Sequence, residues 1–227
     1  MCFYLGFYFA NVVLHQMNIA AISGLLASQF IICPTDGSKK GDIEQVMGKL
    51  FLALIRTADT CSLDLSRCIL AKLALNAKKY PVALCKGKAG KYTKYSNETG
   101  ITKSSGQSTV EELFNMPQSL PNESNASVNE ITELISKFAS DRNWDMYHTE
   151  RNLILALIGE LGELAELFQW KGDGPDGAPI GLKNWEDEEK DTVAQELADV
   201  TIYLMRLATK SGVDIGKAAF EVGQQKQ

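Results

Sequence analysis

Apolar residues recur every three or four positions through much of the chain, which is the spacing of an α-helix. From Ile43 to Tyr80 this spacing predicts two helices, which are joined by the turn-forming stretch SLDLS and ended by Pro81. A turn-rich break, from Pro34 to Asp42, precedes them. The expected buried positions are Val46, Leu50, Leu54 and Ala58 in the first helix and Ile69, Leu73 and Ala77 in the second.

The second half of the chain shows the same helical spacing after a polar stretch. Residues 97–127 are rich in Ser, Thr, Asn, Gln and Pro, a composition typical of a linker. Ser127 and Glu130 then form a capping-box pattern at the start of a helix. We expect helices over residues 128–141, 150–170 and 186–211, and a short one from about residue 214. No segment alternates as a strand would, so the predicted fold is all-α.

The first 33 residues carry no Asp, Glu, Lys or Arg. A signal peptide would begin with basic residues, which are missing here. A membrane span would be interrupted by His15, Gln16 and Asn18, although the run from Ile19 to Ile32 is apolar enough to leave a membrane anchor as an alternative. We expect the segment 1–42 to be an atypical or incorrectly assigned N-terminus and not a membrane element.

The overall composition, with 45% hydrophobic and 22% charged residues among 227, is that of a globular protein. The net charge of −5 argues against a nucleic-acid partner, which would need a basic patch. All five cysteines fall in the first 85 residues and none forms a CxxC pair, so they indicate no disulfide framework. These features predict a protein of a reducing compartment, the cytoplasm.

An internal repeat links the two halves of the chain. The stretch LIRTADTCSLDLSRCIL, from Leu54 to Leu70, aligns with LMRLATKSGVDIGKAAF, from Leu204 to Phe220, at an offset of 150 residues. This alignment predicts the end of one unit in residues 43–96, then the linker, and then the beginning of a second unit in residues 128–227.

Two pairs of carboxylates occupy the predicted helices of the second unit. Glu160 and Glu163 are three residues apart, and so are Glu196 and Asp199, so each pair projects from neighbouring turns of one helix. The 32 residues between the pairs are enough for an antiparallel return that brings them together. Four converging carboxylates would repel one another unless a cation lay among them, and oxygen ligands favour Mg²⁺ or Mn²⁺. We therefore predict a divalent-metal site here, with a solvated acidic stripe as the alternative.

Aromatic side chains surround the acidic pairs in the sequence. Trp144, Tyr147 and His148 precede the first acidic helix, Trp170 ends it, and Tyr203 lies one turn beyond the second pair. Because Trp and Tyr faces stack on nucleobases, these residues are candidates for binding a nucleoside. The alternative is that they are core aromatics at helix ends, with His148 as a cap or a core histidine.

Several motifs of this region occur together and in order. They are W-x-x-x-H from Trp144, R-N-L from Arg151, GELGELAELFQWK from Gly159 and E-L-A-D-V-x-x-Y from Glu196. Between about Glu130 and Ala219 the chain resembles the dCTP pyrophosphatase family of MazG-like nucleoside triphosphate pyrophosphohydrolases. The resemblance implies an all-α, MazG-like four-helix-bundle fold, with the upstream helices as a partial repeat of the same family.

The resemblance also implies an activity. A dNTP, expected to be dCTP or a modified dCTP, would be hydrolysed between its α and β phosphates to dNMP and pyrophosphate, which serves nucleotide-pool sanitation. The positions that match the Mg²⁺ ligands are Glu160, Glu163, Glu196 and Asp199, of which Glu160 or Glu163 would hold the catalytic water. The positions that match the surroundings of the nucleoside are Trp144, His148, Trp170 and Tyr203, with Tyr147 in the same binding segment. Family members form homo-oligomers, so a dimer or tetramer is expected.

The chain departs from the family pattern in three ways. The acidic unit lacks the N-x-x-x-Y-P segment, which occurs instead in the upstream unit, from Asn76 to Pro81. The upstream unit in turn lacks the acids, because Val46 and Lys49 stand where the repeat would place Glu196 and Asp199. A family histidine is also replaced, by Ile135, and this position bears on base selectivity.

Two interpretations of the upstream unit stay open. It completes the acidic unit, within the chain or across a dimer, or the sequence is a fused or misassembled gene product. The alternative to an enzyme is a catalytically degenerate MazG-like module that binds nucleotides or partner helices without turnover.

Overall fold

The structure, a computed structural model, describes residues 12–32, 40–88, 126–169, 182 and 185–225. Its elements in chain order are α2 (Val12–Ile32), α3 (Lys40–Thr60), α4 (Leu65–Lys79), α5 (Val82–Cys85), α8 (Val128–Asp141), the 3-10 turn η1 (Trp144–Met146), α9 (Glu150–Gln169), α10 (Asp187–Lys210) and α11 (Ile215–Gln224). No strand occurs among the described residues, so the prediction of an all-α fold is confirmed for them.

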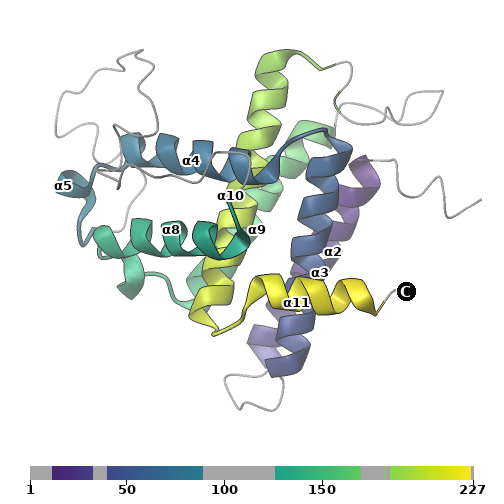
Figure 1. The fold of residues 1–227 in the computed structure, drawn as a ribbon, viewed down its shortest axis with the longest axis horizontal. Helices are drawn as coiled ribbons and strands as arrows, with labels where there is room; N and C mark the ends of the chain where they lie inside the picture. Colours follow the sequence, from purple (N-terminus) through teal and green to yellow (C-terminus); the bar gives the residue numbers. More distant parts are fainter. Residues whose placement is uncertain (1–11, 33–39, 89–125, 170–181, 183–184, 226–227) are drawn as a thin grey trace, which may run out of the picture.

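The long helices α9 and α10 pack against each other and form the middle of the molecule (Figure 1). Helices α4 and α8 lie across α10 on one side, and α2 and α3 run along the other side. Apolar side chains of α9 and α10 are fully or almost fully buried between these layers, among them Leu157, Leu164, Leu197 and Leu204. The upstream helices therefore contact the acidic helices within the same chain.

Local contacts determine where the helices begin and end. Ser127 Oγ accepts a hydrogen bond from the amide of Glu130, whose carboxylate accepts one from the amide of Ser127, so the predicted capping box is confirmed. Four of the predicted helices agree with the structure to within one residue at each described end. The predicted break over residues 34–42 is too long, because α3 already begins at Lys40. Asp42 lies in its first turn, where a carboxylate is favoured by the helix dipole.

The apolar N-terminal segment contributes a helix to the body of the protein. Helix α2 contacts both α3 and α9, and its residues Ile19 and Leu26 are buried. Among the helices that the structure describes, none is long and apolar enough to cross a bilayer.

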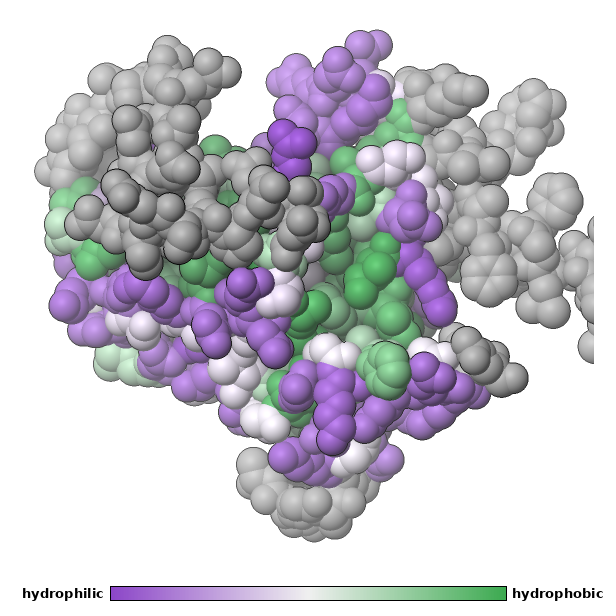
Figure 2. Space-filling model, in the orientation of Figure 1, coloured by the Kyte–Doolittle hydropathy of each residue, from purple (hydrophilic) through white to green (hydrophobic). Residues whose placement is uncertain are grey.

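The surface of the molecule is mixed in polarity (Figure 2). On the face shown, hydrophilic side chains gather over α8 and over the first turns of α10, where Asp187, Glu188 and Glu189 follow one another. Apolar side chains show in the middle of this face, between α10 and α3.

Candidate functional site

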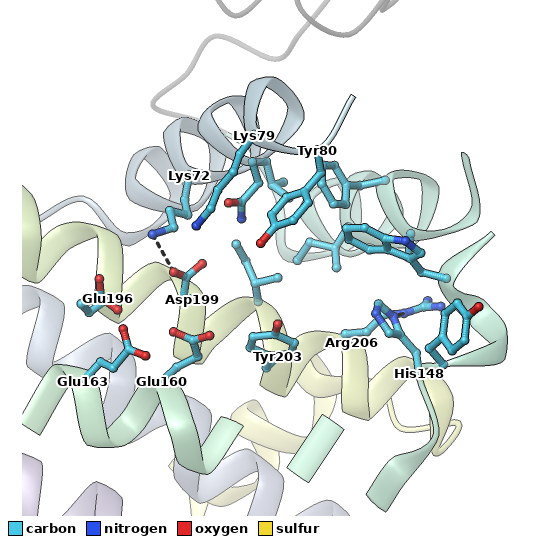
Figure 3. Close-up of a pocket in the computed structure, with 18 residues that line it drawn as sticks. Lys72, Lys79, Tyr80, His148, Glu160, Glu163, Glu196, Asp199, Tyr203 and Arg206 are labelled. Carbon is cyan, nitrogen blue, oxygen red and sulfur yellow. Dashed lines mark hydrogen bonds and ion pairs between the residues drawn. The ribbon is translucent and has the colours of Figure 1, made fainter. Parts of the chain in front are cut away.

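A cavity of about 560 Å³ is lined by residues of α4, α8, α9 and α10 and of the η1 segment. This volume is typical of small-molecule binding sites. Carboxylates of α9 and α10 lie at one end of the cavity, Tyr203 lies in the middle, and His148 and Arg206 lie at the other end (Figure 3). The predicted acidic residues and the predicted aromatic residues that the structure describes therefore line the same cavity.

Three of the four predicted metal ligands converge closely. One carboxylate oxygen from each of Glu160, Glu196 and Asp199 lies within 4.8 Å of the others. Glu163 lines the same cavity beside Glu196 but is not part of this group of three. The buried Oε2 atom of Glu196 has no hydrogen-bond partner among the described residues. A set of oxygen donors with an unpartnered, buried oxygen fits a hard divalent cation such as Mg²⁺.

The carboxylates of this cluster resist ionisation. Burial, together with repulsion from Asp199, Glu163 and Glu196, raises the pKa of Glu160 to about 7. Burial also raises the pKa of Glu196 and of Asp199, although the Lys72 ammonium opposes the increase at both. The fully ionised cluster is therefore costly in the absence of additional positive charge.

Helix α4 supplies positive charge from the opposite wall. Lys72 Nζ lies 2.6 Å from Asp199 Oδ2, and both side chains are mostly buried, with 12% and 14% of their surfaces exposed. Asn76, Lys79 and Tyr80 follow on the same side of α4 and also line the cavity. None of these four residues was among the predicted site residues, although Asn76 and Tyr80 belong to the N-x-x-x-Y-P segment that the acidic unit lacks. The spacing of Lys72, Asn76 and Lys79 by four and then three residues also marks one helix face.

Trp144 forms part of the wall at the far end of the cavity. Its indole Nε1 donates hydrogen bonds to the carbonyl oxygens of Cys85 and Lys88, at 3.3 and 3.1 Å. Its ring packs edge-on against Tyr80, with the ring centroids 5.3 Å apart. The segment after α4 therefore positions Trp144, whose polar atom is already used and whose ring remains for contact with a ligand.

The other predicted aromatic residues differ in their surroundings. The Tyr147 hydroxyl donates a hydrogen bond to the carbonyl oxygen of Gly87 at 2.8 Å, so this side chain is also held by the segment after α4. Burial, and the nearby carboxylates of Glu160 and Asp199, raise the pKa of Tyr203, which therefore keeps its proton and can donate it in a hydrogen bond. Trp170 lies outside the described residues.

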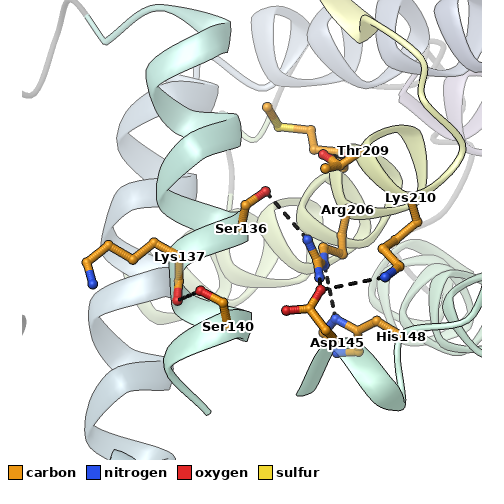
Figure 4. Close-up of polar contacts among 9 residues, drawn as sticks. Ser136, Lys137, Ser140, Asp145, His148, Arg206, Thr209 and Lys210 are labelled. Carbon is orange, nitrogen blue, oxygen red and sulfur yellow. Dashed lines mark hydrogen bonds and ion pairs between the residues drawn. The ribbon is translucent and has the colours of Figure 1, made fainter. Parts of the chain in front are cut away.

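Arg206 organises the end of the cavity that lies away from the acids (Figure 4). Only 4% of this residue is exposed, and its guanidinium pairs with Asp145, while Nε donates to Nδ1 of His148 at 3.1 Å. Burial and the positive charge of Arg206 lower the pKa of His148 to about 4, so the ring is neutral at neutral pH. With Nδ1 accepting, the ring proton belongs on Nε2, which can act as a donor. Nothing local in the sequence indicates this role, because arginine in a helix is usually solvated.

Arg142 connects α8 to the end of α4. It is 4% exposed, and its guanidinium donates to the carbonyl oxygens of Tyr80 and Phe138, at 2.8 and 2.9 Å. Its own carbonyl accepts a hydrogen bond from the amide of Gly87 at 2.9 Å. These contacts fix the wall that carries Tyr80 and Trp144, so the shape of the cavity depends on both halves of the chain.

Comparison with known proteins identifies relatives of part of the chain. It is 46% identical over 92 residues to dCTP pyrophosphatase 1 from Rattus norvegicus, which is 40% of this chain and 52% of the relative. It is 48% identical over 89 residues to dCTP pyrophosphatase 1 from Homo sapiens, which is 39% of this chain and 50% of the relative. For the Bos taurus protein of the same name the identity is 45% over 95 residues, or 42% and 54% of the two chains.

The chain thus spans about half the length of the curated relatives it matches. No protein-family model matches it. The match to the relatives is nevertheless long and close enough to establish common descent for the aligned part. Over about 90 residues the chain is homologous to dCTP pyrophosphatase 1, a MazG-like protein, and the resemblance that the motifs indicated is confirmed.

Proposed function

We propose that this protein is a Mg²⁺-dependent nucleoside triphosphate pyrophosphohydrolase that converts a dNTP and water into dNMP and pyrophosphate. The observation that carries the proposal is the single cavity in which a carboxylate cluster, two lysines and a group of aromatic residues meet. Mn²⁺ is a possible substitute, since it accepts the same oxygen ligands.

The polyphosphate is expected at the acidic end of the cavity. Glu160, Glu196 and Asp199 would hold the cation, which when bound would neutralise the triphosphate and polarise its attacked phosphorus. Lys72 and Lys79 project from the opposite wall, where their ammonium groups can donate to phosphate oxygens. Without Lys72 and Lys79, only the bound cation would offset the repulsion between the carboxylates and the triphosphate.

Glu163 is the better of the two predicted candidates for activating water. Its carboxylate lines the cavity beside the cluster but lies outside the convergent group of three, so it remains available to a water molecule. In the proposed reaction the water gives a proton to this carboxylate and its oxygen bonds to the α-phosphorus. The bond between that phosphorus and the bridging oxygen breaks, and pyrophosphate leaves.

The nucleoside is expected at the other end, where Trp144, Tyr147, His148 and Tyr203 line the cavity. The aromatic rings provide stacking surface, and the neutral His148 offers a proton on Nε2 to a carbonyl oxygen of the base. The names of the relatives point to dCTP, and a modified dCTP would suit the apolar side chain of Ile135, which is also part of the wall.

The test is pyrophosphate release from each of the four dNTPs with Mg²⁺ and the full chain. We expect turnover with dCTP, and loss of at least about a hundredfold in kcat in Glu163→Gln, the size of a general-base effect. Glu166→Gln is the matched control, because Glu166 is an exposed carboxylate of the same helix that does not line the cavity. Full turnover in Glu163→Gln would contradict the assignment of the water to this residue.

A degenerate module that binds nucleotides without turnover is the second candidate. The close contact of Lys72 with Asp199 favours it, because an ammonium group there competes with a metal ion for the same carboxylate. Nucleotide binding with no pyrophosphate release from any dNTP would support the module. The homo-oligomer and the cytoplasmic location stay predictions in both cases.

A further inference from the structure

A second, smaller cavity of about 210 Å³ lies on the other side of the molecule, between α2, α3 and α11. Asn18 and Ile22 of α2, Lys49 and Arg56 of α3 and Val222 of α11 line it. It shares no lining residue with the acidic cavity and is separate from the proposed active site.

The two cavities correspond to each other position by position. Five of the seven residues that line the small cavity stand 150 positions from residues that line the large one. The pairs are Lys49 with Asp199, Leu52 with Ile202, Ala53 with Tyr203, Arg56 with Arg206, and Val222 with Lys72. The sequence repeat has the same offset of 150 residues. The small cavity therefore lies in the upstream unit at the position that corresponds to the large cavity in the acidic unit.

The packing of the helices agrees with this correspondence. Helix α3 contacts α2 and α11, just as α10 contacts α9 and α4. The turns after α3 and α10 are also alike, because Ser62 and Gly212 have positive φ angles of 57° and 65°. Asp64 and Asp214 then cap the following helices by accepting from amides three residues later, at 3.0 and 2.9 Å.

Helix α2 corresponds to the acidic helix α9. At an offset of 138 positions, Gly24, Leu26 and Phe30 align with Gly162, Leu164 and Phe168. The same offset places Ile22 at the position of Glu160 and Leu25 at the position of Glu163. Together with Val46 and Lys49 on α3, the four acidic positions of the large cavity are occupied by three apolar residues and one cation.

The large cavity holds cations and carboxylates together, whereas the charged residues that are described in the lining of the small cavity are the two cations Lys49 and Arg56. Lys49 and Arg56 are both partly buried, and neither forms an ion pair with a carboxylate of the described residues. Lys49 Nζ donates to Oε1 of Gln45 at 3.0 Å, which leaves two of its three protons for another acceptor. Two partly desolvated cations that share a cavity and lack a counter-charge are a recognisable arrangement for an anion.

We propose that this second cavity binds a phosphate-class anion, phosphate or pyrophosphate, directly and without a divalent metal. Arg56 presents a planar fork of donors that matches two oxygens of a phosphate group, and Lys49 contributes a point charge from two turns earlier in α3. The amide side chain of Asn18 lines the same cavity and offers a further donor. Among the residues that the structure describes, no carboxylate lines the cavity to oppose such an anion.

Isothermal titration of the full chain with pyrophosphate in excess EDTA tests the site, because EDTA excludes binding through a metal. We expect the wild-type chain to bind one equivalent of pyrophosphate. In the double variant Lys49→Gln, Arg56→Gln the affinity should fall by about tenfold or more, because charge-assisted hydrogen bonds to the anion are lost. Arg56→Lys, which keeps the charge, should retain most of the affinity. Lys72→Gln, in the large cavity, should leave this metal-free binding unchanged.

The proposal fails if pyrophosphate does not bind in EDTA. It also fails if Lys72→Gln removes the binding while the double variant keeps it, because the large cavity is then the only site. Circular dichroism melting of each variant identifies loss of folding. If the double variant unfolds, the single variant Arg56→Met tests the site, and it should bind pyrophosphate severalfold more weakly than the wild type. Neither a nucleotide nor turnover enters the assay, so the outcome is independent of the proposed enzymatic function.

Discussion

Neutralising Glu160 should stabilise the metal-free protein, and the effect should depend on pH. Because the pKa of this carboxyl is raised from 4.5 to about 7, the folded state between these pH values holds a proton that the unfolded chain has released. The contribution of Glu160 to the free energy of unfolding is therefore fully present below pH 4.5 and lost as the pH rises to about 7. In Glu160→Gln this loss should be absent.

The size of the effect follows from the same pKa. Raising the pKa of Glu160 to about 7 corresponds to at most about 3 kcal/mol of unfolding free energy, and water in the cavity should reduce this to about 1–2 kcal/mol. His148 changes stability in the opposite sense, since its pKa of about 4 makes the folded state lose stability as the pH falls below 6.5. The difference between wild type and Glu160→Gln cancels the histidine contribution, so this difference is the quantity to measure.

Urea unfolding in EDTA at about pH 5 and about pH 8 gives this difference. We expect the two proteins to be nearly equal at the lower pH and Glu160→Gln to be more stable at the higher pH. With saturating Mg²⁺ at the higher pH the wild type should become the more stable of the two proteins. It alone keeps all the carboxylates that would hold the ion, and an ion that binds the folded state stabilises it. Glu166→Gln should show neither change. A wild type that is equally or more stable than Glu160→Gln at high pH in EDTA would refute the reasoning.

Three further predictions concern packing and charge. Gly48→Ala should destabilise the protein by about 1–3 kcal/mol, because the added Cβ would lie 2.5 Å from the Ala218 carbonyl oxygen. Gly24→Ala should stabilise it by about 0.5–1 kcal/mol, because nothing lies within 4 Å of the added Cβ. Urea unfolding measures both effects. Arg142→Met should cost about 3 kcal/mol or more in the same assay, since the buried carbonyl of Phe138 and the partly buried carbonyl of Tyr80 lose this donor, and an unchanged midpoint would contradict this. Lys72→Met should strengthen Mn²⁺ binding and raise KM for the nucleotide, measured by titration and kinetics.

The acidic half of the site could be predicted because its signals are local. Spacing by three residues places two carboxylates on adjacent turns whatever the tertiary structure is, and the length between the pairs favours a hairpin. In the structure Glu163 lies beside Glu196 and Glu160 beside Asp199, the order that antiparallel helices produce (Figure 3). The sequence could not determine that only three of the four would converge closely, because that depends on side-chain rotamers and helix rotation.

The other half of the site depends on contacts between distant parts of the chain. Lys72 lies more than a hundred residues before Asp199, and nothing local indicates that α4 packs across α10. Arg206 could not be recognised for a similar reason, because its burial depends on tertiary contacts with Asp145, His148 and Ser136, which offset the cost of desolvating its charge. Helix α2 was ambiguous because a segment that is apolar on all sides has no face from which a partner can be inferred.

The small cavity provides a control for the role of the acids in the large one. Helices α2 and α3 pack together with Ile22, Leu25 and Val46 at positions that correspond to carboxylates of α9 and α10. Pairing of the helices therefore does not require acidic residues at these places. In the large cavity, burial and the neighbouring acids raise the pKa of Glu160, so this carboxylate costs stability when it ionises. Asp199 gains an ion pair with Lys72, but the pairing of the helices does not need the acids, so their cost fits the proposed cation site. The reversal of stability by Mg²⁺ in Glu160→Gln is the measurement that tests this.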